Sequence, residues 1–596
     1  MAKKSTDKQK KIVETLLHDE ASRKNIPTAE YQSVMRAEDL SPIRVAYERR
    51  NCDLDPQLVW RGKDEQDWSD LVVAAPPLYI QEKVHPKVLI DDLQRQTQAS
   101  KEATAPQFDL FADFNGLPSA EARTEFYQHD AHWSNRMILG DSLQVMASLA
   151  EREGLRGKVQ CIYIDPPYGI KFNSNFQWST TSRDVKDGSV EHMTREPEQV
   201  KAFRDTWRDG IHSYLTYLRD RLTVARDLLT DSGSIFVQIG DENVHRVRAV
   251  LDEVFGDENF ISGINFVTTG GFETGKLANV ADHILWYGKT PQFSKYRQLW
   301  EEFNSARQEA SYRWVKEAPG VTRSLSSNES IEPLLESRAR LFKPDNLISQ
   351  GSGNGDNPFE VRGRIFRPAS NSHWKARYPD GMLRLLRGDR VYPAANSLRY
   401  IREIADFPVK ARANLWDDTA TGQFTDTKVY VVQTNVKVIE RCILMATDPG
   451  DLVLDPTCGS GTTAYVAEQW GRRWITIDTS RVALALARAR IMGARYPYYL
   501  LADSQEGQTK EAELQGKVPS NAPTHGNIRH GFVYERVPHI TLKSIANNAE
   551  IDVIWEEYQT RLEPLRAQLN AALGKQWEEW EIPREPDSKW PHCSET

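Results

Sequence analysis

From residue 135 onward, short apolar runs alternate with amphipathic stretches. The apolar runs are rich in β-branched residues and predict buried strands at 136–139, 159–164, 234–239, 451–455 and 473–478. Apolar residues at three- and four-residue spacing predict helices at 142–151, 199–230, 240–255, 436–446, 464–470 and 480–494. Strands that alternate with helices in this way predict an α/β domain built on a mostly parallel sheet.

The remaining segments follow different patterns. Two helices are expected near 5–24 and 28–50, two strands at Ile264–Thr268 and His283–Tyr287, a linker at 505–530 and a helix over 551–569. Residues 291–412 lose the α/β rhythm, which indicates an inserted domain. We therefore expect an accessory region at 1–130, two halves of one domain at 131–290 and 413–510, the insert at 291–412 and a helical extension at 511–596.

The first candidate for chemistry is the end of the run 159–164. The strand stops at Asp165, because Pro166 and Pro167 cannot donate to a sheet ladder, and Tyr168 follows them. In open α/β sheets, ligands bind at the carboxyl ends of strands. A carboxylate, backbone carbonyls and a flat ring suit a planar group that carries an exocyclic amine, such as adenine. The polar stretch 171–200 that follows is long enough for a lid.

The second candidate is a glycine loop between a strand and a helix. It reads Asp455-Pro456-Thr457-Cys458-Gly459-Ser460-Gly461-Thr462-Thr463, and Asp478 ends the next strand. Glycines let a ligand approach the backbone, the helix start offers N–H groups, and the acid suits ribose hydroxyls. The spacing also fits a dinucleotide fingerprint. The other half of this sheet carries Asp165 instead of a second nucleotide site, which favours S-adenosylmethionine over NAD.

Composition narrows the class of protein. The 596 residues are 39% hydrophobic and 27% charged, as in a soluble globular protein, and neither a membrane span nor a secretory leader is expected. The five cysteines lack paired or zinc-type spacing, so we expect reduced thiols, a cytoplasmic protein and no metal. The net charge is −8, yet residues 338–412 hold 15 Lys+Arg against 7 Asp+Glu, a net of +8. A basic segment in an acidic chain is typical of contact with a polyanion.

With both motifs in hand, the chain resembles the β class of DNA methyltransferases that methylate amino groups. Asp165-Pro166-Pro167-Tyr168 matches the catalytic motif of that family, and Asp455 to Thr463 matches its S-adenosylmethionine motif. The order of the motifs, with a variable insert between them, is that of the β class. The long spacing, and stretches such as 164–175, 233–244 and 452–480, resemble the modification subunits of type III restriction systems and their close relatives. The resemblance covers about 131–500 well, extends less clearly to about 580, and is poor over 1–130.

The resemblance implies a Rossmann-like sheet that is circularly permuted, with an inserted target-recognition domain and helical terminal extensions. A strand must then lie beside the Asp478 strand. Residues 137–141, ending in Asp141, are favoured over the rival 498–503. The family often has His-Pro-Thr-Gln-Lys-Pro before the helix preceding the glycine loop. Here that region reads Val432-Gln433-Thr434-Asn435-Val436-Lys437, so either Thr434 or Asn435 is expected to contact the methionine carboxylate.

The resemblance further implies a site-specific transferase that methylates N6 of a flipped-out adenine in double-stranded DNA. Asp165 to Tyr168 are expected to be catalytic. Cofactor binding is expected from Asp141, Thr434, Asp455, Thr457, Gly459, Gly461, Thr462 and Asp478. N4 of cytosine is the alternative target, and a recognition subunit without catalysis or an RNA methylase are alternative functions. The expected partners are a second copy of the chain and a restriction subunit with helicase and nuclease activity. The helical tail suits either partner, or packing on the rest of the chain.

Overall fold

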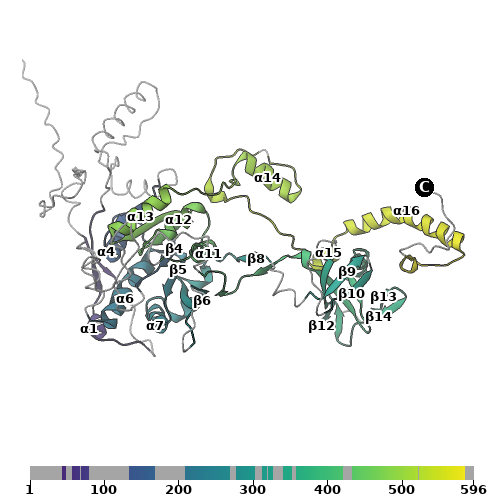
Figure 1. Cartoon of the computed structure of the whole chain (residues 1–596), viewed down its shortest axis with the longest axis horizontal. Helices are drawn as coiled ribbons and strands as arrows, with labels where there is room; N and C mark the ends of the chain where they lie inside the picture. Colours follow the sequence, from purple (N-terminus) through teal and green to yellow (C-terminus); the bar gives the residue numbers. More distant parts are fainter. Residues whose placement is uncertain are drawn as a thin grey trace, which may run out of the picture. The chain divides into compact units, whose positions relative to one another are not determined.

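The computed structural model describes part of the chain, which divides into two compact units. The described residues are 43–47, 57–67, 69–78, 133–167, 209–268, 277–302, 312–318, 320–326, 340–351, 357–420, 433–520 and 522–583. Unit 1 is Met1–Leu299 with Ala413–Val533, and unit 2 is Trp300–Arg412 with Tyr534–Thr596. Each unit is therefore assembled from two segments of the chain (Figure 1).

The core of unit 1 is an eight-stranded sheet in the order β19-β6-β7-β5-β4-β20-β21-β3. Its strands are β3 (Arg136–Leu139), β4 (Val159–Ile164), β5 (Leu229–Ile239), β6 (Phe260–Val267), β7 (Ala281–Gly288), β19 (Leu415–Trp416), β20 (Leu452–Asp455) and β21 (Arg473–Asp478). Neighbours pair in parallel except around β7, which runs antiparallel to β5 and to β6. The predicted α/β fold with a mostly parallel sheet is confirmed.

Helices cover both faces of this sheet (Figure 1). One face of the sheet, which includes Ile162, Ile235 and Leu454, is buried by helices α4 (Ser142–Glu151), α6 (Ile211–Leu228) and α7 (Val244–Phe255). Helices α11 (Val436–Ala446) and α12 (Thr462–Gln469) bury the other face with Cys161, Tyr163 and Phe236. Alternate residues of β4 point to opposite faces and all are buried, which explains why its sequence is a continuous apolar run.

The permuted order of strands is confirmed by the pairing at the end of the sheet. Strand β3 pairs in parallel with β21, with Leu139 opposite Asp478, so residues far apart in sequence become neighbours. The rival segment 498–503 forms no strand of this sheet, and its Leu501 makes an isolated bridge with Phe532. The preferred position of Asp141, just after β3, therefore holds.

Two predictions of helix extent are wrong. The helix predicted to end at Thr230 ends at Leu228, because Leu229 turns into an extended conformation and opens β5. Residues 43–47 form strand β1 instead of the end of a helix, since Ile43, Val45 and Tyr47 follow a two-residue period. The rest of the expected helix 28–50 and the helix 5–24 lie outside the described residues, as do 199–208 of the long helix.

The segment predicted as a linker at 505–530 contains helix α14 (Gln505–Gln515). Its sequence is polar, so apolar periodicity gives no sign of it. Both ends nevertheless carry helix signals: the Ser504 side chain caps the Gly507 N–H, and Gly516 adopts the left-handed conformation that ends many helices. Helix α13 (Arg481–Met492) precedes it and begins at the capping residue Ser480.

A buried cluster of charges joins the N-terminal segment to helices α6 and α7. Strand β1 (Ile43–Tyr47) pairs with β2 (Leu71–Ala75), and α1 (Lys63–Asp67) lies between them in the chain. Lys63 contacts Glu253 at 2.7 Å, and Arg219 contacts Glu253 and Asp67, each at 2.6 Å. Lys63, Arg219 and Glu253 are buried, so these ions neutralise each other away from water.

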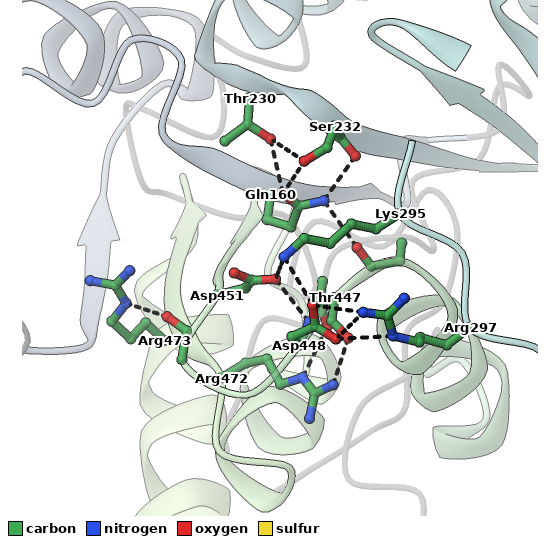
Figure 2. A network of polar contacts seen from close by, with 12 residues as sticks. Gln160, Thr230, Ser232, Lys295, Arg297, Thr447, Asp448, Asp451, Arg472 and Arg473 are labelled. Atoms are coloured by element: carbon green, nitrogen blue, oxygen red, sulfur yellow. Dashed lines mark hydrogen bonds and ion pairs between the residues drawn. The ribbon is translucent and has the colours of Figure 1, made fainter. Parts of the chain in front are cut away.

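At the amino ends of the parallel strands, a polar network closes the sheet edge (Figure 2). Gln160 accepts hydrogen bonds from Thr230 and Ser232 and donates to the carbonyls of Ser232 and Ala446. Nearby, Lys295 contacts Asp451 at 2.6 Å and Asp448 at 3.1 Å, and Arg472 donates to the Thr447 carbonyl at 2.7 Å. Because these groups satisfy one another, this edge is structural.

Unit 2 contains a five-stranded antiparallel sheet in the order β10-β9-β11-β17-β16. Its elements are β8 (Trp300–Glu302), β9 (Trp314–Ala318), β10 (Val321–Ser324), β11 (Arg340–Asn346), β12 (Ile348–Gln350), β13 (Phe359–Val361), β14 (Arg364–Phe366), β15 (Ser372–Trp374), α10 (Asp380–Arg387), β16 (Val391–Pro393), β17 (Leu398–Glu403), β18 (Val409–Ala411), α15 (Leu542–Ala546) and α16 (Glu550–Leu573). Helix α15 packs into the core beneath α10, so the C-terminal segment completes this unit.

Many aromatic and basic residues of the 338–412 segment are structural. Phe366, Trp374 and Tyr400 are buried in the core of unit 2. Arg384 and Arg387 both pair with Asp552 of α16, and Arg390 pairs with Asp406. In the described part of the chain, no helix is long and apolar enough to cross a membrane.

Candidate active site

Four parallel neighbours place four acids at one edge of the sheet. Strands β20 and β21 end at Asp455 and Asp478. Asp165 directly follows β4, and Asp141 follows β3 after one intervening residue, Gly140. These strands lie in the order β4-β20-β21-β3, so their carboxyl ends meet along the same edge. Open α/β sheets bind ligands at the carboxyl ends of their strands. Gln160 and Lys295 lie at the other end, where the strands begin. The structure therefore brings together the two predicted motifs.

Asp165 lies in a setting that favours its neutral form. Burial raises the pKa of Asp165 to about 7, with the negative charges of Asp455 and Asp282 adding to the rise. A hydrogen bond from the Thr434 hydroxyl, 3.1 Å from Oδ2, opposes this shift. Pro166 is buried and Pro167 is partly buried, whereas Tyr168 and the 171–200 segment lie outside the described residues.

The glycine loop is bonded directly to Asp165, the first residue of the Asp-Pro-Pro-Tyr motif. Thr457 Oγ1 accepts the backbone N–H of Asp165 at 2.9 Å and donates to Asp455 Oδ1 at 3.1 Å. Asp455 also accepts the Thr457 backbone N–H at 2.8 Å. Burial raises the pKa of Asp455 to about 6, although these bonds and one from Thr463 lower it. A single threonine thus fixes the loop after β4 relative to the loop after β20.

Gly461 occupies a position that needs glycine for two reasons. Its φ is +71°, in the left-handed region, where it caps the start of α12. A Cβ on this residue would lie 2.6 Å from the Cβ of Ala487 in α13. Gly459 also has positive φ, at 50°. At the start of α12, the Thr462 hydroxyl accepts a bond from Arg490 at 2.7 Å and lies 2.9 Å from the Ser460 hydroxyl.

Asp478 and Asp141 are already partly bonded within the chain. The Asp478 carboxylate accepts the backbone N–H groups of Gly459 at 2.9 Å and Ser480 at 2.8 Å, and burial raises its pKa to about 6. Asp141 caps α4 through the Leu143 N–H and pairs with Arg221 at 2.7 Å. Asp478 therefore shapes the glycine loop as well as standing at the end of its strand.

Several residues of the site escape the sequence analysis. Arg221 and Tyr217 belong to α6, and the Arg221 guanidinium lies 3.5 Å from the centre of the Tyr217 ring. The pKa of Tyr217 is raised by burial, and Asp141 and Asp478 add to the rise. Gln238 and Tyr163 lie inside strands whose apolar sequence predicts only core. A polar residue within such a run, as Gln238 is within β5, is the signal that was available.

Thr434 lies beside Asp165 and precedes α11. Its hydroxyl contacts Asp165 Oδ2 and the side-chain amide of Gln238, at 3.1 and 3.0 Å. Asn435 instead caps α11, accepting the Lys437 N–H at 2.9 Å. Of the two residues proposed for the methionine carboxylate, Thr434 is the one that contacts the Asp165 carboxylate.

A model of the DNA methylase family that covers N6 and N4 enzymes matches residues 159–489, which is more than half of the 596 residues. The chain belongs to this family. The match begins at β4 and ends inside α13, so it contains Asp165, the insert and the glycine loop. The family assignment therefore rests on segments that include Asp165, Asp455 and Asp478, whereas Asp141 precedes the matched residues.

Related proteins carry restriction-modification names. The chain is 27% identical over 374 residues to the type II methyltransferase M.EcaI of Enterobacter cloacae, covering 61% of this chain and 70% of that protein. It is 25% identical over 381 residues to the Mod subunit of the type III enzyme EcoP15I of Escherichia coli, covering 58% of each. The matches span 50 to 62% of the length of four type III Mod subunits.

A solved structure is also similar. A putative DNA modification methylase from Thermus thermophilus, complexed with S-adenosyl-L-methionine, matches with 15% identity and a TM-score of 0.28. The match covers 60% of this chain and 94% of that protein.

Proposed function

We propose that this member of the DNA methylase family transfers a methyl group from S-adenosylmethionine to N6 of adenine in double-stranded DNA. The observation that carries the proposal is the bond between Asp165 and Thr457. It holds a carboxylate suited to an amine next to a glycine loop suited to a nucleoside. Neither motif alone specifies a methyl transfer, but their contact at one sheet edge supports it.

The residues of this edge fit S-adenosylmethionine. Carboxylates at the ends of three neighbouring strands, Asp455, Asp478 and Asp141, are acceptors for ribose hydroxyls and for an ammonium group. The glycine loop leads into α12, whose N-terminus favours a negative group through its free N–H groups and its dipole. When bound, the cofactor supplies a methyl group activated by its sulfonium.

The chain must then position the accepting amine. Adenine N6 is a weak nucleophile, because its lone pair is delocalised into the ring. A carboxylate at Asp165 accepts an N6 hydrogen bond that strengthens as positive charge develops on nitrogen. Pro166, which is buried, offers its carbonyl as a second acceptor, and Tyr168 is proposed to stack on the base. The base must leave the duplex to reach this edge.

The choice of adenine over cytosine rests on the acid. An aspartate begins the catalytic motif here, whereas cytosine N4 enzymes more often begin it with serine. N4 of cytosine is chemically similar to N6 of adenine, because both are exocyclic amines next to a ring nitrogen. We therefore propose adenine as the target. If cytosine is the target instead, the product is N4-methylcytosine.

Unit 2 is proposed to read the DNA sequence, and the basic residues of 338–412 to contact phosphates. This segment includes Arg364 of β14 and Arg399 of β17. Unlike Arg384 and Arg387, these two arginines do not pair with Asp552. The relatives named as type III Mod subunits suggest that the chain acts in the cytoplasm as the modification and recognition subunit of a restriction system. Its proposed partners are a second copy of the chain and a separate restriction subunit.

The test incubates the purified chain with methyl-labelled S-adenosylmethionine and a mixture of duplex DNAs. The DNA is then digested to nucleosides and analysed by chromatography. Labelled N6-methyladenine with the wild type, and none with Asp165→Ala, is the expected result. Label in N4-methylcytosine would change only the target base. No labelled nucleoside with any DNA, or unchanged labelling with Asp165→Ala, would reject the assignment.

A further inference from the structure

Two buried polar side chains lie on the same face of the sheet, behind Asp165. Strands β4 and β5 run in parallel with Tyr163 opposite Phe236, so Gln238, two residues further along, points to the same face. Tyr163 is 1% exposed and Gln238 is 3% exposed. The Tyr163 hydroxyl donates to Gln238 Oε1 at 2.5 Å. Buried polar groups are costly unless hydrogen-bonded, so this pair indicates a defined arrangement.

The hydrogen bonds continue from Gln238 to the catalytic acid. Gln238 Nε2 donates to Thr434 Oγ1 at 3.0 Å, and Thr434 Oγ1 donates to Asp165 Oδ2 at 3.1 Å. A hydroxyl group carries a single proton. While Thr434 accepts the amide N–H, its own proton is directed at the Asp165 carboxylate.

The direction of these hydrogen bonds depends on the orientation of the Gln238 amide. Thr434 Oγ1 also lies 3.2 Å from Gln238 Oε1. This oxygen is a second acceptor for the Thr434 proton, and it competes with Asp165 Oδ2, which lies 3.1 Å away. The Tyr163 hydroxyl donates to the same amide oxygen at 2.5 Å, which weakens that oxygen as an acceptor for Thr434 and leaves the Thr434 proton to Asp165.

We propose that Tyr163 and Gln238 are positioning residues, which orient the Thr434 hydroxyl toward Asp165 and thereby keep the catalytic carboxylate charged and correctly directed. The proposal rests on the function proposed above. It gives Thr434 a role toward the catalytic acid, whereas the family resemblance implies a role toward the cofactor.

The charges around Asp165 define what loss of this hydroxyl would do. Burial raises the pKa of Asp165, and the negative neighbours Asp455 on β20 and Asp282 on β7 raise it further. Tyr214 on α6 is a third titratable neighbour, and its own pKa is raised in part by Asp165. The Thr434 hydroxyl opposes these effects. If the Thr434 hydroxyl did not donate to Asp165, the Asp165 carboxyl group would stay protonated up to a higher pH.

The experiment measures single-turnover methylation of a DNA substrate against pH for the full chain. The variants are Thr434→Val, Gln238→Leu, Gln238→Glu and Tyr163→Phe. Each is expected to move the acidic limb of the rate profile to higher pH, with rates below the midpoint falling by about three- to tenfold. Gln238→Glu is expected to shift the limb further than Gln238→Leu, because its carboxylate competes for the Thr434 proton and adds negative charge.

Two controls separate positioning from general damage. Gln160→Leu removes a different buried glutamine, on β4, whose bonds lie at the amino ends of the strands (Figure 2). It is expected to lower the melting temperature without moving the acidic limb. Thr434→Ser keeps the hydroxyl and is expected to restore the limb lost in Thr434→Val.

The outcomes distinguish this inference from the proposed function. If the wild type methylates DNA but the four variants keep its acidic limb, the inference fails and the function stands. An equal shift in Gln160→Leu would also overturn it, because general destabilisation would then account for the effect. If the wild type methylates no DNA, the proposed function fails first.

Discussion

The backbone N–H of Asp165 donates to the side-chain oxygen of Thr457 at 2.9 Å, across 292 positions of sequence. Thr457 in turn donates to Asp455, the acid that ends the strand before the glycine loop. One hydroxyl therefore sets the distance between the loop proposed to hold the target amine and the loop proposed to hold the methyl donor. In-line transfer depends on such distances, because small displacements of reacting groups cost large factors in rate.

Thr457→Val tests this contact, because valine keeps the shape of threonine and removes its hydroxyl. The partly buried Asp165 N–H and the buried Asp455 then each lose a partner, which costs about 1–3 kcal/mol. The expected result is a fall in the single-turnover rate of about tenfold or more with a smaller change in cofactor affinity. Thr457→Ser keeps the hydroxyl and serves as the control. Equal rates for Val and wild type would show that the bond does not align the loops.

The raised pKa of Asp165 predicts how stability depends on pH. The folded carboxyl has a pKa of about 7 against an ordinary value of 3.8, so between these values the folded state binds the proton more tightly than the unfolded state. Stability contributed by this group therefore falls as pH rises from about 4 to about 7. Asn cannot ionise, and its side-chain oxygen still accepts the Thr434 bond.

Asp165→Asn is therefore expected to be inactive yet more stable than the wild type at pH 8. Its advantage in melting temperature should shrink at pH 5, where the folded wild-type carboxyl is already neutral. Thermal unfolding at both pH values, followed by circular dichroism, makes the comparison. An Asn variant that melts below the wild type at pH 8 would contradict the expectation that the Asp165 charge is costly in the fold.

Gly461→Ala tests the start of α12. Alanine at φ +71° is strained, and its Cβ would lie 2.6 Å from Ala487, so α13 must shift. Gly516→Ala is the matched control: Gly516 has φ +63°, with no atom within 4 Å of an added Cβ. Strain alone costs about 1–2 kcal/mol, and Gly461→Ala is expected to cost more and to weaken binding of S-adenosylmethionine in calorimetry. Equal losses for the two variants would show that packing on Ala487 is unimportant.

The sequence predicts much of this fold because several of its strands are continuous apolar runs. A parallel strand buried on both faces must be apolar throughout, so β4, β20 and β21 are recognisable without any contact information. The permuted neighbour β3 follows from the need for a strand beside Asp478. Local periodicity fails where polar end signals define an element, as Ser504 and Gly516 do for α14.

Some residues of the candidate site are predictable from local sequence, whereas others depend on contacts between distant segments. Asp165 and Asp478 are predictable because an acid after an apolar run lies at a strand end. Thr457 is predictable as part of the glycine loop, but its bond to Asp165 depends on β4 lying beside β20. Gln238 and Tyr163 require knowledge of strand register, which periodicity within each strand does not contain. The basic segment 338–412 likewise conceals its pairs with Asp552, since these ions come from distant parts of the chain.

The buried charges between α1 and helices α6 and α7 provide the last prediction. Lys63 Nζ contacts Glu253 at 2.7 Å and donates to the Leu58 carbonyl at 2.8 Å, with its side chain 1% exposed. Lys63→Met keeps the length of the side chain but leaves Glu253 with one cation fewer, in the interior. Loss of one partner of a buried pair costs about 3–5 kcal/mol. Arg219, which also contacts Glu253, is expected to hold the loss toward the lower end of this range.

Urea unfolding of the full chain, followed by tryptophan fluorescence, measures the loss from Lys63→Met, with the exposed Lys158→Met as control. Glu253→Gln in the Lys63→Met background should cost less than in the wild type, because the charge that it removes has already lost a partner. The two residues should therefore couple by about 0.5–3 kcal/mol in a double-mutant cycle. Additive losses would mean that the Lys63–Glu253 pair does not fasten the N-terminal segment to α7, and that apolar packing of β2 against α4 does so instead.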